Sequence, residues 1–194
     1  MSTFGLIGLL ISFAAVVVSI VCLVAGAIAG RKRASGVAET LTWGGHVAAL
    51  VSAVGLTACC GILVYCFMTG DTSIEYVVRY HSNAAGADAW LYQLAGLWAG
   101  REGSLLFWAW LISLFNSVVA VRNLKRQEKL DSMALLVAQI VLAAFVGVTL
   151  FSESNMPFTA LAAQYLDASG NLRGEAALWG MNLSLIHISE PTRP

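Results

Sequence analysis

The chain is organised around the stretch Leu97-Trp98-Ala99-Gly100-Arg101-Glu102-Gly103-Ser104-Leu105-Leu106-Phe107-Trp108. It places an adjacent arginine and glutamate, bracketed by glycines, at the head of an apolar run that continues without charge to Val121. At about 1.5 Å per residue, residues 103–121 form a helix of about 28 Å, close to the thickness of a hydrocarbon core. Because charge is costly inside a bilayer, the pair marks the end of a membrane-spanning helix and invites a functional question.

Composition supports a membrane protein. Hydrophobic residues make up 58% of the chain and charged residues 11%, which is far from the balance of a soluble domain. The formal net charge is zero, so no basic face for nucleic acid is expected. The cysteines all lie in apolar runs, and none forms the C-x-x-C pair or C-x-x-C-H pattern that would make the chain a c-type cytochrome. We expect them to be free thiols: Cys22, Cys59, Cys60 and Cys66.

Four uncharged runs are long enough to cross a bilayer: 4–30, 41–70, 103–121 and 132–152. The first is interpreted as a retained helix and not a signal peptide, because no basic residue precedes it and a basic cluster follows it. Trp90, Tyr92 and Trp98 precede the third run, as in an interfacial aromatic belt. The predicted fold is an all-α polytopic membrane protein of about four transmembrane helices, with an interfacial helix before the third.

Basic residues predict the orientation. They cluster after the first run, in a loop extending from Arg31 to about Thr40, and between the third and fourth runs, which marks both loops as cytoplasmic and places the N-terminus outside. Residues 71–89 carry one basic side chain against three acidic ones, as suits the outer face. Within them Ile74, Tyr76 and Val78 alternate with other residues, which allows a short strand.

The charged pair has two interpretations. Neighbours on a helix point about 100° apart, so Arg101 and Glu102 each need a separate partner. Arg101 is suited to hold a carboxylate such as a haem propionate. The other interpretation is an interfacial pair that orients the helix among lipid head groups. Gly96, Gly100 and Ser104, at a spacing of four, also predict a smooth strip for a neighbouring helix backbone.

Two histidines are further candidates. His46 lies near the inner end of the second run, where it is either a haem ligand or proton relay, or a neutral, hydrogen-bonded packing residue. His81 lies in the outer loop, where it is either a ligand or simply solvated.

The stretch 97–108 resembles the W-G-x-x-E-G-S-L-L-x-W segment of the cytochrome c maturation haem-lyase proteins of the CcmF/NrfE type. Shorter likenesses occur in order at residues 65–77, 91–98, 152–158 and 178–182. Ala99 stands where that family usually has glycine, and Arg101 where it often has histidine or alanine. The cofactor-binding residues stay unknown at this point, with His46 and Arg101 as candidates. The residues that match the family motif are Trp98, Gly100, Glu102, Gly103, Ser104 and Trp108.

The resemblance further implies haem as the cofactor, and apocytochrome c, a haem chaperone and other cytochrome c maturation subunits as partners, in the bacterial plasma (inner) membrane. Residues 1–182 then correspond to the N-terminal transmembrane region, and the family's haem-ligand histidines are expected beyond Asn182. Residues 183–194 resemble a translated sequencing adapter, so no ligand role is given to His187. No catalytic residue or metal ligand is assigned, and the chain as written is expected to be inactive alone.

Other functions stay open on the residues alone. One is a small helical subunit of a transporter or respiratory complex, although uncharged crossings argue against an ion path. Another is a purely structural four-helix membrane protein. The sequence does not separate a general from a nitrite-reductase-specialised role in cytochrome assembly.

Overall fold

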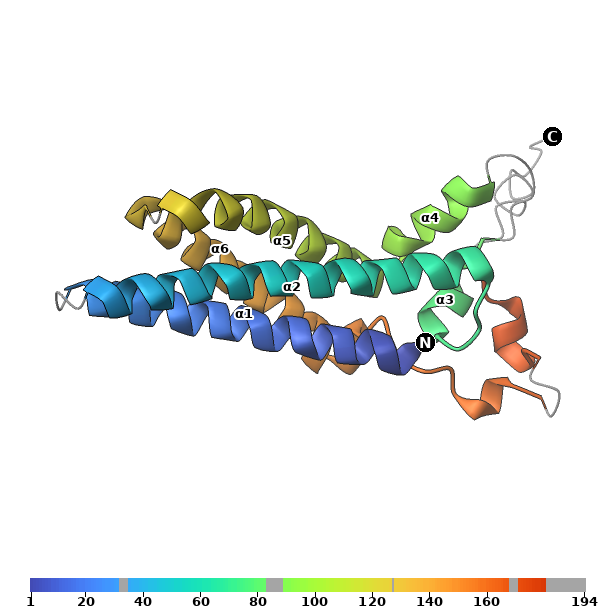
Figure 1. The fold of residues 1–194 in the computed structure, drawn as a ribbon. Coiled ribbons are helices and arrows are strands. Elements are labelled where there is room, and N and C mark those ends of the chain that lie inside the picture. The colour runs from blue at the N-terminus through green and yellow to red at the C-terminus, as the bar shows by residue number, and fades with distance from the viewer. Residues whose placement is uncertain (32–34, 83–88, 127, 168–170, 181–194) are drawn as a thin grey trace, which may run out of the picture.

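Two antiparallel helical hairpins form an elongated bundle in the computed structural model, which describes residues 1–31, 35–82, 89–126, 128–167 and 171–180 (Figure 1). The first hairpin pairs α1 (Ser2–Arg31) with α2 (Ser35–Thr69), and the second pairs α5 (Arg101–Arg126) with α6 (Lys129–Phe151). These four described helices are long and apolar enough to cross a membrane, which confirms the predicted all-α polytopic fold. The end holding the motif is called the motif end, and the opposite one the basic end.

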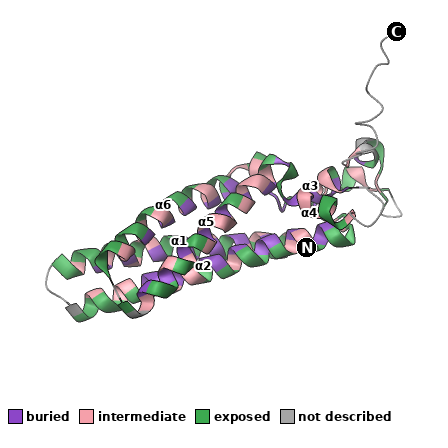
Figure 2. Cartoon of the chain, turned by 90° about the horizontal axis from the view of Figure 1, so that it is seen from above, coloured by how far each residue is buried: buried purple, intermediate pink, exposed green. Residues whose placement is uncertain are grey.

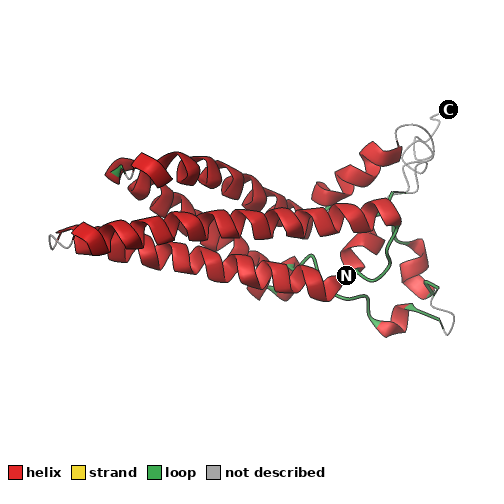
Figure 3. Ribbon diagram, in the orientation of Figure 1, coloured by secondary structure: helices red, strands yellow, loops and turns green. Residues whose placement is uncertain are grey.

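Shorter helices gather at the motif end (Figure 3): α3 (Glu75–Tyr80), α4 (Ala89–Ala99), η1 (Glu153–Asn155), η2 (Ala163–Tyr165) and η3 (Gly174–Leu178). The strand allowed around Ile74 to Val78 is wrong, because α3 begins at Glu75 and Ile74 makes only an isolated bridge with Ala160. An ion pair of 2.7 Å between Arg79 and Glu75, one turn apart, favours the helix. Helix α4 occupies the place of the predicted interfacial helix; its depth in a membrane stays a prediction.

The first hairpin packs closely through small residues. A Cβ added to Gly26 would lie 2.6 Å from the Thr42 hydroxyl, whereas one added to Gly30 would lie 3.8 Å from the Ala38 Cβ. Close packing at Gly26 follows from the absence of a side chain there. Helix α2 ends where Gly70 adopts a φ of +66°, a left-handed conformation that glycine enters without strain.

The faces of the bundle divide by burial (Figure 2). Large apolar side chains point outward on every long helix; Val54, Phe115 and Phe151 are about 70% exposed or more. Such faces are stable only against lipid or other apolar surfaces. The cysteines are free thiols, as expected, and three of them lie in the main buried cluster: Cys59, Cys60 and Cys66.

The basic residues at the basic end of the bundle lie largely on helices. Helix α2 begins at Ser35, five residues before the predicted end of the first basic loop at Thr40, and α5 continues past Val121 to Arg126. Basic side chains near a helix C-terminus complement its dipole, which favours this extension. The adapter-like segment 183–194 lies outside the described residues.

Candidate functional site

The motif contains a helix break at Gly100, between α4 and α5. The Tyr76 hydroxyl donates to the Gly96 carbonyl at 2.9 Å and accepts from the Gly100 amide at 3.1 Å. The Ser104 hydroxyl donates to the Trp98 carbonyl at 2.9 Å. A break leaves backbone groups without helical partners, and two side-chain hydroxyls supply those partners here. The motif is therefore a helix junction built around a tyrosine from α3.

Two motif glycines are required by this packing. A Cβ on Gly103 would overlap both the Leu97 carbonyl oxygen and the Tyr76 hydroxyl. A Cβ on Gly100 would lie 2.5 Å from the Tyr80 ring and 2.8 Å from the Tyr76 ring. Neither position leaves room for a side chain, so both glycines serve the docking of α3.

The predicted strip for a neighbouring helix backbone is wrong. Gly96 faces the Phe67 ring, whose nearest atom would lie 2.7 Å from an added Cβ, and Gly100 faces tyrosine rings. The break also interrupts the helical repeat before Ser104 is reached. Aromatic side chains, not a second backbone, fill the space left by these small residues.

Within the part of the chain that the structure describes, Arg101 and Glu102 do not pair with each other, as their angular separation predicts. The Arg101 Nη2 donates to the Ser154 carbonyl at 2.8 Å and so ties the start of α5 to η1. The Glu102 Oε2 is shielded from solvent and has no hydrogen-bond partner among the described residues. Both side chains line a cleft of about 300 Å³ with residues from α3, η1 and the following segment: Glu75, Tyr76, Arg79, Glu153, Ser154, Met156 and Thr159.

The charged side chains that line this cleft differ in their partners. Arg79 is engaged by Glu75 through its Nε and Nη2, at 3.0 and 2.7 Å, and its guanidinium also lies 4.6 Å from the centre of the Trp179 ring. Burial raises the pKa of Tyr76 well above the usual value, and the negative charge of Glu102 raises the pKa further. The phenol therefore stays protonated and remains a donor to the junction.

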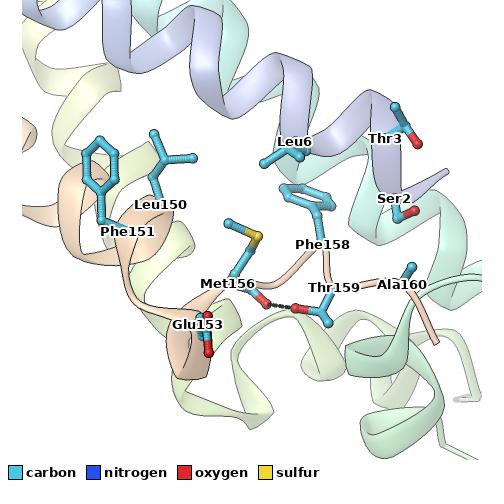
Figure 4. A pocket seen from close by; sticks show the side chains of 10 residues that line it. All are labelled: Ser2, Thr3, Leu6, Leu150, Phe151, Glu153, Met156, Phe158, Thr159 and Ala160. Atoms are coloured by element: carbon cyan, nitrogen blue, oxygen red, sulfur yellow. Dashed lines mark hydrogen bonds between the residues drawn. The ribbon is translucent and has the colours of Figure 1, made fainter. Parts of the chain in front are cut away.

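A second, more apolar cleft of about 540 Å³ lies beside the first, between the start of α1, the end of α6 and the segment 156–160 (Figure 4). The Phe158 ring of that segment packs against Gly5, where a Cβ would overlap it. The Glu75 amide donates to the Thr159 carbonyl at 3.0 Å, which fastens the segment to α3. Glu153 lines both clefts.

His46 has the contacts of a packing residue. It is 1% exposed, its Nδ1 lies 2.7 Å from the Thr42 carbonyl oxygen, and its Nε2 lies 3.1 Å from the Asn123 side-chain nitrogen. These partners require a neutral ring that donates from Nδ1 and accepts at Nε2. Both nitrogens are thus engaged, which leaves none for a metal.

His81 is partly buried, and its Nδ1 is enclosed without a hydrogen-bond partner among the described residues. Within that part of the chain no group of three or more histidine, cysteine or acidic residues could hold a metal ion.

The motif tryptophans point outward. Trp98 is 47% exposed and Trp108 is 57% exposed, and the Trp98 ring lies 5.6 Å from that of Phe107. The sequence placed Tyr76 in the outer loop, but it did not predict that Tyr76 packs at the helix break or that Phe158 packs against Gly5. The sequence shows each of these residues only as an aromatic residue in a largely polar stretch, and that pattern does not predict what the ring packs against.

Comparison with known proteins links the chain to cytochrome c biogenesis, although no family model matches it. It is 34% identical over 86 residues to the probable cytochrome c-type biogenesis protein NrfE of Escherichia coli, a match covering 44% of this chain and 15% of the relative. It is 29% identical over 160 residues to the cytochrome c-type biogenesis protein CcmF of Pseudomonas fluorescens, a match covering 82% of this chain and 22% of the relative. The resemblance expected from the sequence is thereby confirmed over part of each relative.

A solved structure of cytochrome c haem lyase CcmF shares the fold, with a TM-score of 0.58 and 24% identity over 84% of this chain and 25% of that one. The chain thus spans about a fifth of the length of the relatives it matches.

Proposed function

We propose that this chain is a membrane component of cytochrome c biogenesis that takes part in haem handling and attachment to apocytochrome c. The observation that carries the proposal is the similarity to proteins named for cytochrome c biogenesis, one of which matches 82% of the chain. The membrane is the bacterial plasma membrane, with the N-terminus and the motif end outside. The basic residues at the opposite end support this orientation.

Haem fits the described residues only in part. Arg101 uses one nitrogen for the Ser154 carbonyl, so its remaining donors can hold an anionic propionate. Arg101 is exposed and lines the cleft, which suits such contact. His46 does not suit the iron, because both of its ring nitrogens are engaged, whereas the Nδ1 of His81 is enclosed and has no partner among the described residues. From the resemblance to the haem-lyase family, the iron ligands are expected from residues outside those described.

Glu102 provides the second contact. Its shielded Oε2 has no partner among the described residues, and a buried carboxylate oxygen left this way is costly. A hydrogen-bond donor from apocytochrome c or from another maturation subunit would relieve that cost. Arg101 and Glu102 both line the cleft at the start of α5, next to the junction held by Tyr76, so one cleft presents both an anionic and a cationic group.

Deletion of the gene from its native host tests the proposal. Membranes are separated by electrophoresis and stained for covalently bound haem, with immunoblots against the same apocytochromes. We expect covalently bound haem to be lost while apocytochrome is still made, and to return with a plasmid copy of the gene. Unchanged haem-stained cytochromes in the deletion strain would overturn the proposed function.

A further inference from the structure

A layer of buried polar side chains crosses the middle of the bundle. It separates two hydrophobic clusters, one containing Val16, Leu56, Ala109 and Leu142, the other Leu23, Ala49, Ala120 and Leu135. Between these positions each long helix contributes at least one polar residue that is at most 4% exposed: Ser19, Ser52, Ser113, Asn116 and Gln139. These five residues are called the polar layer.

Asn116 and Gln139 lie at the same level of the second hairpin. The Asn123 side-chain nitrogen donates to the Ser132 hydroxyl at 2.9 Å, which fixes the register of α5 against α6. Asn116 and Gln139 each lie about two helical turns from that contact, along antiparallel helices. Both are near the midpoints of their helices, so the layer falls at the depth where a bilayer is driest.

The serines of the layer are satisfied, but the carboxamides are not. Ser19, Ser52 and Ser113 donate to backbone carbonyls at 2.7–2.8 Å, which leaves their oxygens free to accept. Neither side-chain polar atom of Gln139, nor the side-chain nitrogen of Asn116, has a hydrogen-bond partner among the described residues. Buried groups of this kind are nearly always paired with protein or ordered water.

We propose that the polar layer binds internal water, held between the carboxamides of Asn116 and Gln139. Water both donates and accepts, as these groups require, and Gln139 alone offers it an acceptor and two donors. An ion is disfavoured because the layer contains no titratable side chain to balance its charge. The bound water links α5 to α6 at mid-depth and fixes their register there. This inference is independent of the proposed function.

Solid-state NMR of the full-length protein in lipid bilayers detects the water directly. With ¹⁵N-labelled glutamine and asparagine, polarisation is transferred from water protons to the side-chain amides, and Gln139→Leu identifies the relevant signal. We expect rapid transfer to the Gln139 amide despite complete burial. A dry Gln139 amide, or one bonded directly to Asn116, would overturn the proposal.

A double-mutant cycle tests the coupling. Asn116→Leu and Gln139→Leu are each expected to lower the folded-to-unfolded ratio about tenfold, because each strands the other carboxamide. The double variant is expected to recover to within about threefold of the native ratio. Ser117→Ala, a change beside the layer, is the matched control. Additive single effects would contradict a shared water.

Discussion

The Tyr76 hydroxyl lies 3.1 Å from the backbone nitrogen of Gly100, so a side chain from α3 closes the break between α4 and α5. The same hydroxyl donates to the Gly96 carbonyl on the other side of the break. One tyrosine therefore joins the two helices that carry the motif. The position of Glu102, at the first turn of α5, depends on this contact.

Tyr76→Phe removes that hydroxyl and leaves buried backbone groups without partners. We expect the free energy of unfolding to fall by about 2 kcal/mol, the usual cost of stranding buried polar groups. Thermal unfolding in detergent measures the change. Tyr80→Phe is the matched control, because the Tyr80 ring packs on the same glycine. Equal stability of the two variants would contradict the capping role of Tyr76.

Gly103→Ala should disrupt the junction, since the added methyl group overlaps the Leu97 carbonyl and the Tyr76 hydroxyl. Overpacking of this kind costs about 1–3 kcal/mol. Gly61→Ala is the control, because a Cβ there would meet nothing within 4 Å. Its stability should be unchanged or slightly higher, as expected for alanine in a helix. We expect the free energy of unfolding to fall in the Gly103→Ala variant but not in the Gly61→Ala variant.

Alkaline pH should weaken the contribution of Tyr76. Burial raises the pKa of Tyr76 in the folded protein above the value of about 10 expected when unfolded. The unfolded chain therefore loses this proton first, so the stabilisation is complete below about pH 10 and declines as pH rises beyond it. The stability difference between native protein and Tyr76→Phe, measured from pH 8 to 11, should shrink above pH 10. A stability difference between the two proteins that stays constant from pH 8 to 11 would refute the raised pKa of Tyr76.

His46→Gln separates packing from haem ligation. Glutamine keeps an acceptor for Asn123 but loses the rigid ring, so a stability loss of about 1–2 kcal/mol is expected. The haem content that the proposed function assigns to the purified protein should be the same in the variant, because both ring nitrogens are already engaged. Loss of haem from a well-folded variant, seen by absorption spectroscopy, would instead identify His46 as a ligand.

Local patterns predicted the four long helices because a bilayer allows few alternatives to an uncharged helix of sufficient length. That Arg101 and Glu102 do not pair with each other also followed from helix geometry alone. Those two predictions rest on single segments of sequence and needed no knowledge of tertiary contacts.

Contacts between distant segments were not predictable in the same way. Tyr76 lies in a polar stretch whose alternation allowed a strand, yet its hydroxyl meets Gly96 and Gly100 about twenty residues later. The glycines signalled close packing, but the sequence did not say that rings would fill the space. Phe158 reaches Gly5 across almost the whole chain, a contact that only the fold reveals.

The proposed function is tested most directly by the amount of haem-stained cytochrome c in the deletion strain carrying Glu102→Gln. Glu39→Gln, on the exposed start of α2, is the matched control, and immunoblots confirm equal amounts of each variant in the membrane. We expect a loss of about tenfold or more for Glu102→Gln and none for Glu39→Gln, since a neutral amide presents different hydrogen-bonding groups to the partner. Native levels of cytochrome c with Glu102→Gln would contradict a working role for the motif-end cleft.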